Sequence, residues 1–326
     1  MQFRALKTSL AVVLALAGSL PLASRPADAQ GKTTRIIVAF SAGGPIDLVA
    51  RTIAEPMSKS LGNSVIVENR PGGNTLIAAQ AVAQSPPDGS VVFLASLSTL
   101  VLNPLLYAKL PYDPERDFAS VSLVVSTPPV LVVNPATTAN DAAEFAAAVK
   151  ASGKPVAIGS AGIGGTTHIS LELFQQATGV EVLHVPYKGA ADVINDVIGN
   201  HVAGFFGDLP GVISHIRGGK LKPLGILSAS PHPLLPGVKT MAEQGIKGTE
   251  SENWYGMVAP SKTPPDILAK LNAAVVVALQ DEAVKTRLNG VGAVIIGSNA
   301  AHLDQVRQKE KATFGDLIKA KGIKLE

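Results

Sequence analysis

No cysteine occurs among the 326 residues, and this absence excludes disulfide bonds, thiol nucleophiles and cysteine ligands for zinc. A metal site would have to be built from histidine, aspartate and glutamate. The six histidines are scattered, none pairs with another at the i, i+4 spacing of a helical zinc motif, and no H-E-x-x-H sequence is present. His168 and Glu172 stand four residues apart, which is typical of an ordinary pair on a helix surface. We expect neither a metal ion nor another cofactor.

A strong excess of charge of one sign is also missing. The formal net charge is +3, and the first 29 residues contribute +2 of it through Arg4, Lys7, Arg25 and Asp28, so the rest of the chain carries +1. A nearly neutral chain lacks the excess positive charge that binding to a phosphate backbone requires. The sequence therefore argues against nucleic acid as a partner.

Long apolar runs are confined to the N-terminus. Residues 1–29 combine a basic start, an apolar core that begins at Leu10 and a small-residue cleavage pattern at 27–29, which together predict a secretory signal peptide. The apolar run is shorter than the ~20 residues that a membrane span needs, so an anchor is the weaker interpretation. Because no cysteine follows the cleavage site to carry a lipid, we expect a protein free in the periplasm.

One stretch after residue 33 has the pattern strand, glycine loop, helix. The apolar run Arg35–Phe40 predicts a buried parallel strand, and Gly43 and Gly44 allow a sharp turn after it. Pro45 suits the first turn of a helix, and Asp47 places negative charge beside the unpaired N–H groups there. A helix N-terminus with free N–H groups and a positive dipole end is a ready site for an anion.

The same order of elements recurs in the middle of the chain. A short strand at 156–159 precedes the glycine loop Ser160–Gly165, and a helix begins at Thr166. A further strand is followed by a third turn marked by glycine and proline, at Gly207–Gly211. Two similar α/β halves, each with an anion-receptive loop, indicate that one ligand is held between them.

The order of strands predicts how the two halves are joined. The extended stretch 121–133 is interrupted at Pro128-Pro129, and residues 254–260 have the pattern of a strand that returns to the first half. We predict an α/β fold of two doubly wound lobes, residues 30–133 with 255–326 and residues 134–254. Two crossover strands would join the lobes in the geometry of a hinged clamshell.

At two places the local sequence allows more than one structure or role. Pro56 lies inside a pattern that is helical to Leu61, and we expect a kink or an early break there because proline removes a backbone hydrogen bond. Ser96, Ser98 and Thr99 follow a buried strand. They stand where ligands of open α/β sheets bind, or they cap the next short helix.

Short motifs in a fixed order carry a resemblance to a known family, and they are Ile37–Asp47, Val67–Gly72, Leu110–Asp113, Gly159–Gly162, His184–Gly189 and Leu209-Pro210. They resemble the Bug family, the extracytoplasmic substrate-binding receptors of tripartite tricarboxylate transporters. The resemblance covers residues 33–326 and implies a type II periplasmic-binding-protein fold. It also implies a small carboxylated ligand between the lobes, a two-component membrane permease as partner, and no catalysis. We expect a monomer.

The resemblance assigns ligand-binding residues by their position in these motifs. The first glycine loop would face one carboxylate of the ligand, the second loop would face another, and further residues would complete the pocket. These residues are Phe40, Ala42, Gly43, Gly44 and Asp47 in the first loop, Ser160, Gly162, Gly165, Thr166 and Thr167 in the second, and Ser96, Lys188, Gly189, Ala190 and Asp208 around them.

Three departures from the family's pattern leave the identity of the ligand open. Ser41 stands where proline is usual, Gly207-Asp208 where an aspartate–asparagine pair is common, and Thr166-Thr167 where a serine-containing pair is frequent. Aliphatic dicarboxylates, amino acids, aromatic acids and nicotinate-like compounds all stay possible ligands.

Other readings of the same residues also stay open. An exported serine hydrolase would use Ser160 or Ser41 with a histidine, although Gly159–Gly162 does not supply the sequence G-x-S-x-G. A receptor for a membrane signalling partner would use the same pocket as a transport receptor.

Several charged residues have a structural role as their alternative. Arg70 could form an ion pair between the lobes instead of contacting the ligand, and Lys188 could simply be solvated. Asp47 could serve only its own helix, and Asp208 could cap the helix that follows it.

Overall fold

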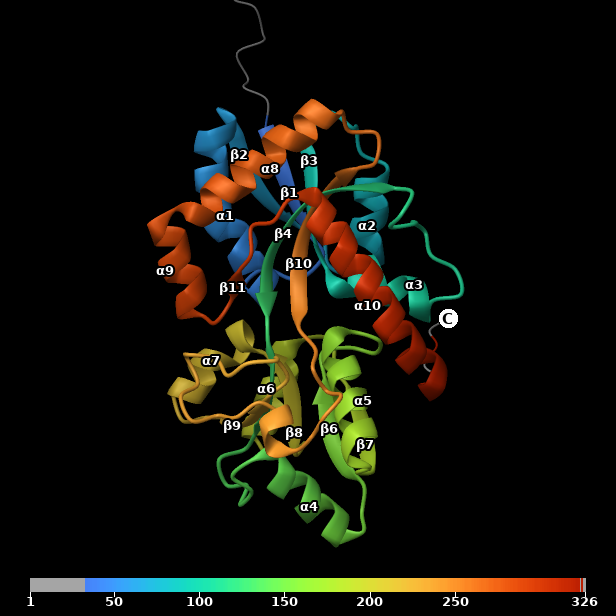
Figure 1. Cartoon of the computed structure of the whole chain (residues 1–326), viewed down its shortest axis with the longest axis vertical. Coiled ribbons are helices and arrows are strands. Elements are labelled where there is room, and N and C mark those ends of the chain that lie inside the picture. Colours follow the sequence, from blue (N-terminus) through green and yellow to red (C-terminus); the bar gives the residue numbers. More distant parts are fainter. Residues whose placement is uncertain (1–32, 323, 325–326) are drawn as a thin grey trace, which may run out of the picture. The chain divides into compact units, whose positions relative to one another are not determined.

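Strands and helices alternate along most of the chain, and the strands collect into two sheets (Figure 1). The computed structural model describes residues 33–322 and residue 324. The predicted signal peptide at 1–29 lies outside the described residues. The described part of the chain belongs to one compact unit that begins at Lys32.

The first sheet has six strands, in the spatial order β11 (Val294–Ile295), β4 (Phe118–Thr127), β10 (Asn253–Pro260), β3 (Val91–Ser96), β1 (Thr33–Val38) and β2 (Ser64–Asn69). β1, β2 and β3 run parallel, whereas β10 runs antiparallel to both β3 and β4. Parallel neighbours require crossover connections, which helices provide. The helical elements of this lobe are α1 (Pro45–Leu61), η2 (Gly73–Thr75), α2 (Leu76–Ala83), η3 (Ser98–Leu102), α3 (Asn103–Leu106), α8 (Pro265–Gln280), α9 (Glu282–Gly290) and α10 (Ala300–Lys321).

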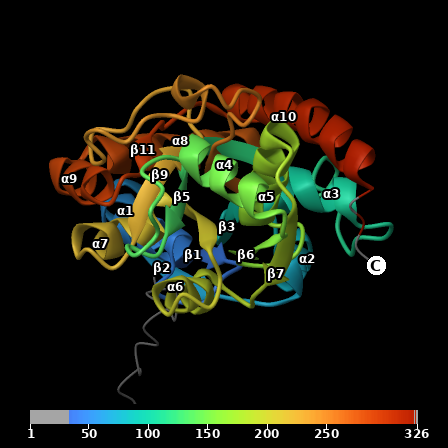
Figure 2. The ribbon, with the colours of Figure 1, turned by 90° about the horizontal axis from the view of Figure 1, so that it is seen from below.

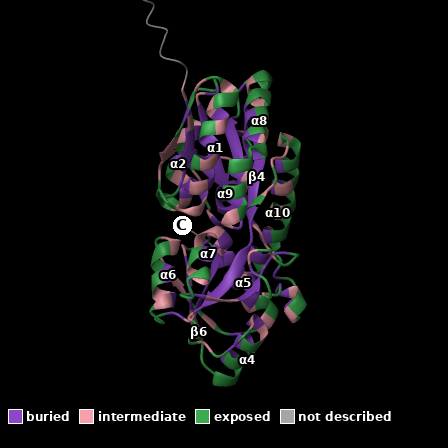
Figure 3. Cartoon of the chain, turned by 90° about the vertical axis from the view of Figure 1, so that its left-hand side faces the viewer, coloured by how far each residue is buried: buried purple, intermediate pink, exposed green. Residues whose placement is uncertain are grey.

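Apolar side chains fill both faces of the first sheet. On one face α1 packs through Ile53 and Met57, which are fully buried, and α8 lies beside it. On the other face the core includes Phe93 of β3 and Phe314 of α10. Every residue of β3 is buried, as expected of a central strand covered on both faces. Figure 3 shows this burial along the strands of the lobe.

The second sheet has five strands, in the spatial order β7 (Val182–Pro186), β6 (Val156–Ser160), β8 (Gly204–Asp208), β5 (Pro129–Val133) and β9 (Lys222–Ile226). β6 runs parallel to β7 and β8, and β5 runs antiparallel to β8 and β9. Alternate residues of β5 enter two cores: Leu131 packs with α4 (Ala142–Ser152) and α5 (Thr166–Thr178), and Val132 packs with α6 (Ala190–Ile198) and α7 (Leu209–Arg217). Figure 2 shows the sheet between these two helix pairs. A short turn, η4 (Ala242–Gln244), follows the sheet.

Two passages of the chain join the sheets, which confirms the predicted architecture of two α/β lobes. Pro128 alone separates β4 from β5, and the return runs from β9 to β10 through residues 227–252. The predicted lobe boundary at residues 133 and 134 assigned β5 to the first lobe, but β5 pairs with β8 and β9. We therefore propose that the lobes divide at Pro128.

The carboxyl ends of the parallel strands in both sheets lie near the link between the lobes at Pro128. Asn253, at the start of β10, pairs with Thr127 at the end of β4, next to Pro128. Its side-chain Nδ2 donates to Asp208 Oδ2, at the end of β8 (2.7 Å). β10 also pairs with β3, so the end of β3 at Ser96 lies beside the first residues of β10. The loops that follow the parallel strands of the two lobes therefore meet across Pro128.

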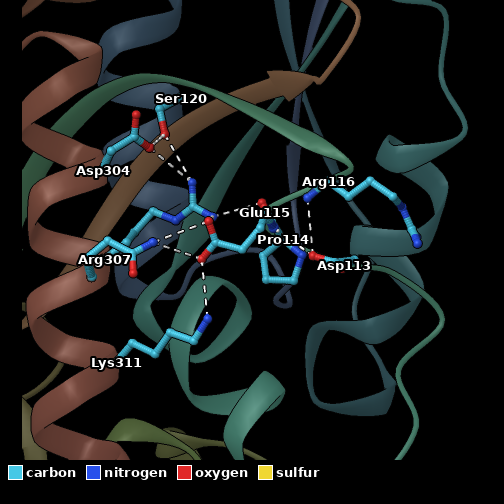
Figure 4. A network of polar contacts seen from close by, with 9 residues as sticks. Asp113, Pro114, Glu115, Arg116, Ser120, Asp304, Arg307 and Lys311 are labelled. Atoms are coloured by element: carbon cyan, nitrogen blue, oxygen red, sulfur yellow. Dashed lines mark hydrogen bonds and ion pairs between the residues drawn. The ribbon is translucent and has the colours of Figure 1, made fainter.

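Helix α10 is anchored in the first lobe and reaches the second. The buried Arg307 donates from Nη2 to the carbonyl of Pro114 (2.8 Å) and from Nη1 to Ser120 Oγ (3.3 Å), as Figure 4 shows. At the other end of α10, Lys321 Nζ lies 3.4 Å from Glu172 Oε2 on α5. This ion pair is a direct contact between the lobes.

Of the two outcomes expected at Pro56, a kink or an early break, the early break is wrong. α1 continues through Pro56 to Leu61 and ends at Gly62 in a left-handed cap. Ile53 and Met57 on either side of the proline are fully buried in the core. Their packing outweighs the loss of one backbone hydrogen bond, since most helical stability in proteins comes from tertiary contacts.

Candidate functional site

The first glycine loop joins β1 to α1 with the geometry that the sequence predicts. Gly43 adopts φ +85°, a left-handed angle that residues with a side chain disfavour. Gly44 caps α1 in an extended conformation, and its carbonyl accepts the first helical hydrogen bond (3.0 Å). The N–H groups of Ile46 and Asp47 come before the bonded part of the helix, so they are available to an anion at its N-terminus.

Asp47 braces this loop instead of facing outward. The carboxylate is buried, and its Oδ2 accepts from Gly43 N and Arg51 Nε (2.9 Å each), while Oδ1 accepts from Asn69 Nδ2 (2.9 Å). Burial alone would raise the pKa of Asp47, but the hydrogen bonds from Arg51, Gly43 and Asn69 outweigh it and hold the pKa below its ordinary value. These contacts support the alternative role of Asp47, which is to stabilise the terminus of its own helix.

The second glycine loop has matching geometry between β6 and α5. Gly162 and Gly164 adopt φ +145° and +73°. Gly165 caps α5 with φ −76° and ψ 170°, nearly the angles of Gly44 at φ −78° and ψ 172°. The first N–H groups of α5, from Thr166 on, are likewise ahead of the bonded part of the helix. The two lobes thus present the same kind of helix terminus.

Two hydroxyls that are predicted to contact a ligand form hydrogen bonds within the second loop. Thr167 Oγ1 accepts from the N–H of Ala161 (2.9 Å). Ser160 is completely buried, its Oγ accepts from the N–H of Gly162 (3.3 Å), and it lies 3.2 Å from the Gly162 carbonyl. Both side chains are therefore engaged inside the protein.

A stacked histidine pair lies behind the second loop. Ser160 Oγ is 2.6 Å from His184 Nε2, and the rings of His184 and His168 stack with centroids 4.0 Å apart. His168 Nδ1 accepts from the N–H of Gly164 (3.0 Å). Sequence reasoning did not connect Ser160 with His184, because the parallel pairing of β6 and β7 that brings His184 close is not visible in a single sequence.

The environment of this pair keeps His184 neutral. Burial and the neighbouring His168 together lower the pKa of His184 to about 4, and they outweigh Glu172, which raises it. His168 Nε2 lies 3.5 Å from Glu172 Oε1. Because the hydroxyl of Ser160 has no exposed surface, a substrate carbonyl has no access to it in this structure. This burial weakens the serine hydrolase alternative.

Ser96 belongs to a buried hydroxyl network. Its Oγ lies 3.3 Å from Thr99 Oγ1 and accepts from Thr99 N (3.4 Å), so the capping role is the one it fills here. Thr99 Oγ1 donates to Thr75 Oγ1 (3.0 Å), as does Asn103 Nδ2 (3.1 Å). Thr75 adopts φ +77°, which is strained for a β-branched residue. Sequence reasoning missed this strained turn, since only the two glycines before it mark a bend.

Asp208 occupies the point where the lobes touch. Its Oδ2 accepts from Asn253, while Oδ1 is buried and has no hydrogen-bond partner among the described residues. Burial raises the pKa of Asp208 to about 6, and hydrogen bonds from Asn253 and Tyr255 lower it by less. The side chain makes no capping hydrogen bond to α7, so the capping alternative is wrong.

The remaining predicted residues lie at the end of β7 and in the loop after β2. Lys188 is exposed, and Gly189, with φ −178°, precedes α6, which begins at Ala190. Arg70 Nε donates to Glu68 Oε1 within β2 (2.6 Å) and so forms its ion pair inside the first lobe. Among the residues that the structure describes, Arg70 forms no ion pair across the lobes.

The starts of α1 and α7 also approach each other. A Cβ placed on Gly211 would lie 3.5 Å from Pro45 Cγ. The two cavities described in the structure, of about 430 and 740 Å³, lie elsewhere and are lined by none of the predicted site residues. Within residues 33–322, no group of three or more histidine, aspartate and glutamate residues could hold a metal ion.

Comparisons with known proteins agree with this architecture. A family model described as "Tripartite tricarboxylate transporter family receptor" matches residues 49–323. The structure of the periplasmic binding protein BugD is 32% identical, with a TM-score of 0.82 over 90% of this chain and 99% of its own. Rpa4515 of R. palustris with adipate is 31% identical (TM-score 0.84, 90% and 98% covered). MatC from Rhodopseudomonas palustris with bound malate is 32% identical (TM-score 0.81, 88% and 98% covered).

The fold is that of a type II periplasmic binding protein, with two α/β lobes and paired glycine loops. The chain belongs to the tripartite tricarboxylate transporter receptor family. That family consists of substrate-binding receptors, as the motifs predict. No helix among the described residues has the length and apolar character to cross a membrane.

Proposed function

We propose that this chain is a periplasmic receptor that binds a small carboxylated organic acid between its lobes and delivers it to a two-component permease. The observation that carries the proposal is the pair of helix N-termini that follow the glycine loops, one in each lobe. Gly44 and Gly165 cap these helices with nearly equal backbone angles, and the strands before them end near the link at Pro128. The adipate and malate held by two similar structures are both dicarboxylates.

Backbone groups suit this task physically. An N–H group of a glycine loop is already fixed in place and carries no full charge that must lose its water. A helix N-terminus stabilises a nearby anion by ~0.3–2 kcal/mol. Two such termini with several hydrogen bonds could reach micromolar affinity, about −8 kcal/mol. In this proposal Ala42–Gly44 and Gly162–Thr166 contact the carboxylates, while Asp47, Ser96 and Ser160 position the loops.

Calorimetric titration tests the binding step. We expect saturable binding of one of succinate, glutarate, adipate or malate, and no binding of its dimethyl ester. Gly43→Ala and Gly162→Ala should each weaken binding roughly tenfold, because alanine disfavours φ +85° and +145°. Gly153→Ala is the matched control, since Gly153 has φ +60° at the end of α4, away from both loops.

Two outcomes would overturn the proposal. One is the absence of binding for every acid of the panel, and the other is unchanged affinity in both loop variants. Delivery is tested separately in cells, where uptake of the bound acid should require both this chain and a permease. Uptake that is unaffected by deletion of the chain contradicts the transport role and leaves the binding role standing.

A further inference from the structure

Helix α5, which begins at the second glycine loop, is shared between two apolar cores. Leu171 and Phe174 on one face of the helix are buried in a core of the second lobe. Ile169 and Leu173 on another face are buried in the core cluster that contains Phe314 of α10. Since α10 belongs to the first lobe, the helix that carries the second loop is packed into both lobes at once.

A chain of polar contacts runs along this helix from the second loop to the end of α10. Gly164 N donates to His168 Nδ1 (3.0 Å), so the neutral imidazole carries its proton on Nε2. That Nε2 lies 3.5 Å from Glu172 Oε1, and the other carboxylate oxygen of Glu172 lies 3.4 Å from Lys321 Nζ. The hydrogen bond from His168, together with Lys321, lowers the pKa of Glu172 although burial opposes this, so the carboxylate is charged at neutral pH.

We propose that Glu172 and Lys321 are positioning residues for the second glycine loop, so that the end of α10 in the first lobe helps to set the geometry in which this loop binds a carboxylate. The inference rests on the proposed function, because it takes this loop as one of the carboxylate sites. Neither side chain has to touch the ligand.

The polar contacts give the mechanism of this positioning. Gly164 has φ +73°, and its N–H is turned to the buried His168 and away from a ligand. Glu172 orients the ring of His168, and Lys321 orients Glu172, since each carboxylate oxygen of Glu172 faces one of the two. Without Lys321 the carboxylate is free to turn, the ring loses its partner at Nε2, and the loop around Gly164 becomes less ordered.

Calorimetric titration with the acid of the panel that binds most tightly tests the effect on affinity. Lys321→Met should weaken binding roughly three- to fivefold, and Lys321→Arg, which keeps the charge, should bind like the natural protein. Glu172→Gln should weaken binding roughly fivefold or more, and adding Lys321→Met to it should then change little, because the two residues act through one contact. Lys319→Met is the matched control, because it removes the same charge from an exposed position in the same last turn of α10.

Hydrogen exchange without ligand, followed by NMR, tests the positioning itself. The Gly164 N–H should exchange roughly threefold faster or more in Lys321→Met and in Glu172→Gln, while the amides of the buried strand β3 keep their rates. Lys319→Met should change neither. If Lys321→Met and Glu172→Gln match this control in affinity or in Gly164 exchange, the inference is overturned and the proposed function stands. If no acid of the panel binds the natural protein, the proposed function fails and the inference fails with it.

Discussion

Burial shifts the pKa values of two residues beside the loops, and it favours the neutral form of each. The pKa of Asp208 is raised to about 6, and the pKa of His184 is lowered to about 4. Between pH 4 and 6 the folded protein binds more protons at Asp208 than the unfolded chain does, so this residue makes stability fall as pH rises. At His184 the unfolded chain binds more protons over the same range, so stability rises with pH. The two effects oppose each other.

Asp208→Asn isolates the first effect. The amide can still accept from Asn253, but it does not ionise, so the cost of burying a charge above pH 6 disappears. The stability of the variant relative to the natural protein should increase from pH 4 to pH 7 by up to about 3 kcal/mol. Urea unfolding at both pH values measures the difference, with the exposed Asp192→Asn as control. A difference that does not change with pH contradicts the buried, ionisable role.

His184→Asn isolates the second effect. Through His184 alone, the natural protein should lose stability from pH 7 to pH 4.5, because the unfolded histidine gains a proton that the folded one resists. Since His184 is only partly buried, the variant should remove about 1–2 kcal/mol of this loss. The control is His302→Asn, an exposed histidine near the start of α10. Parallel stability–pH curves for the natural protein and His184→Asn would show that the stacked pair does not titrate as described.

At the scale of elements, local patterns predicted the strands and helices that form the site. The strand at Arg35–Phe40 and the turn after it could be predicted from neighbouring residues alone, because β-branched residues favour strands and glycine permits positive φ. The left-handed Thr75 and the bond from Ser160 to His184 depend on partners 24 to 28 residues away in the chain. A single sequence does not reveal such partners. The loops could therefore be predicted, but not the groups that hold them.

The continuity of α1 through Pro56 leads to a prediction about stability. Pro56 leaves one backbone carbonyl of the helix without its N–H donor, at a nominal cost of roughly 3 kcal/mol. Pro56→Ala restores the donor beside the well-packed Ile53 and Met57, so it should raise the free energy of unfolding by about 1–3 kcal/mol. Pro265→Ala, at the first position of α8 where proline is favoured, should give no gain. Thermal unfolding measures both, and equal effects would mean that α1 already accommodates the ring.

At the scale of the whole protein, function depends on how the described lobes are connected. β4 and β5 together run from 118 to 133 with only Pro128 outside a strand, and we propose Pro128 as the boundary between the lobes in place of residues 133 and 134. The lobes also contact each other through Asn253 and Asp208 and through Lys321 and Glu172. Closure of the lobes around a ligand would change these contacts.

Pro128→Gly tests whether this passage is the hinge. Glycine keeps the carbonyl that accepts from Leu209 N (3.0 Å), but it frees the φ angle that the proline ring fixes. Lobes on a looser passage should sample more open arrangements, and the binding-competent fraction should fall. We expect roughly three- to tenfold weaker binding of the acid, a larger radius of gyration without ligand and an unchanged radius with it. Pro135→Gly, in the loop after β5, removes a proline outside the passage and should change neither affinity nor scattering. If Pro128→Gly behaves like this control, the lobes do not turn about residue 128, and closure must be sought in the return segment 227–252.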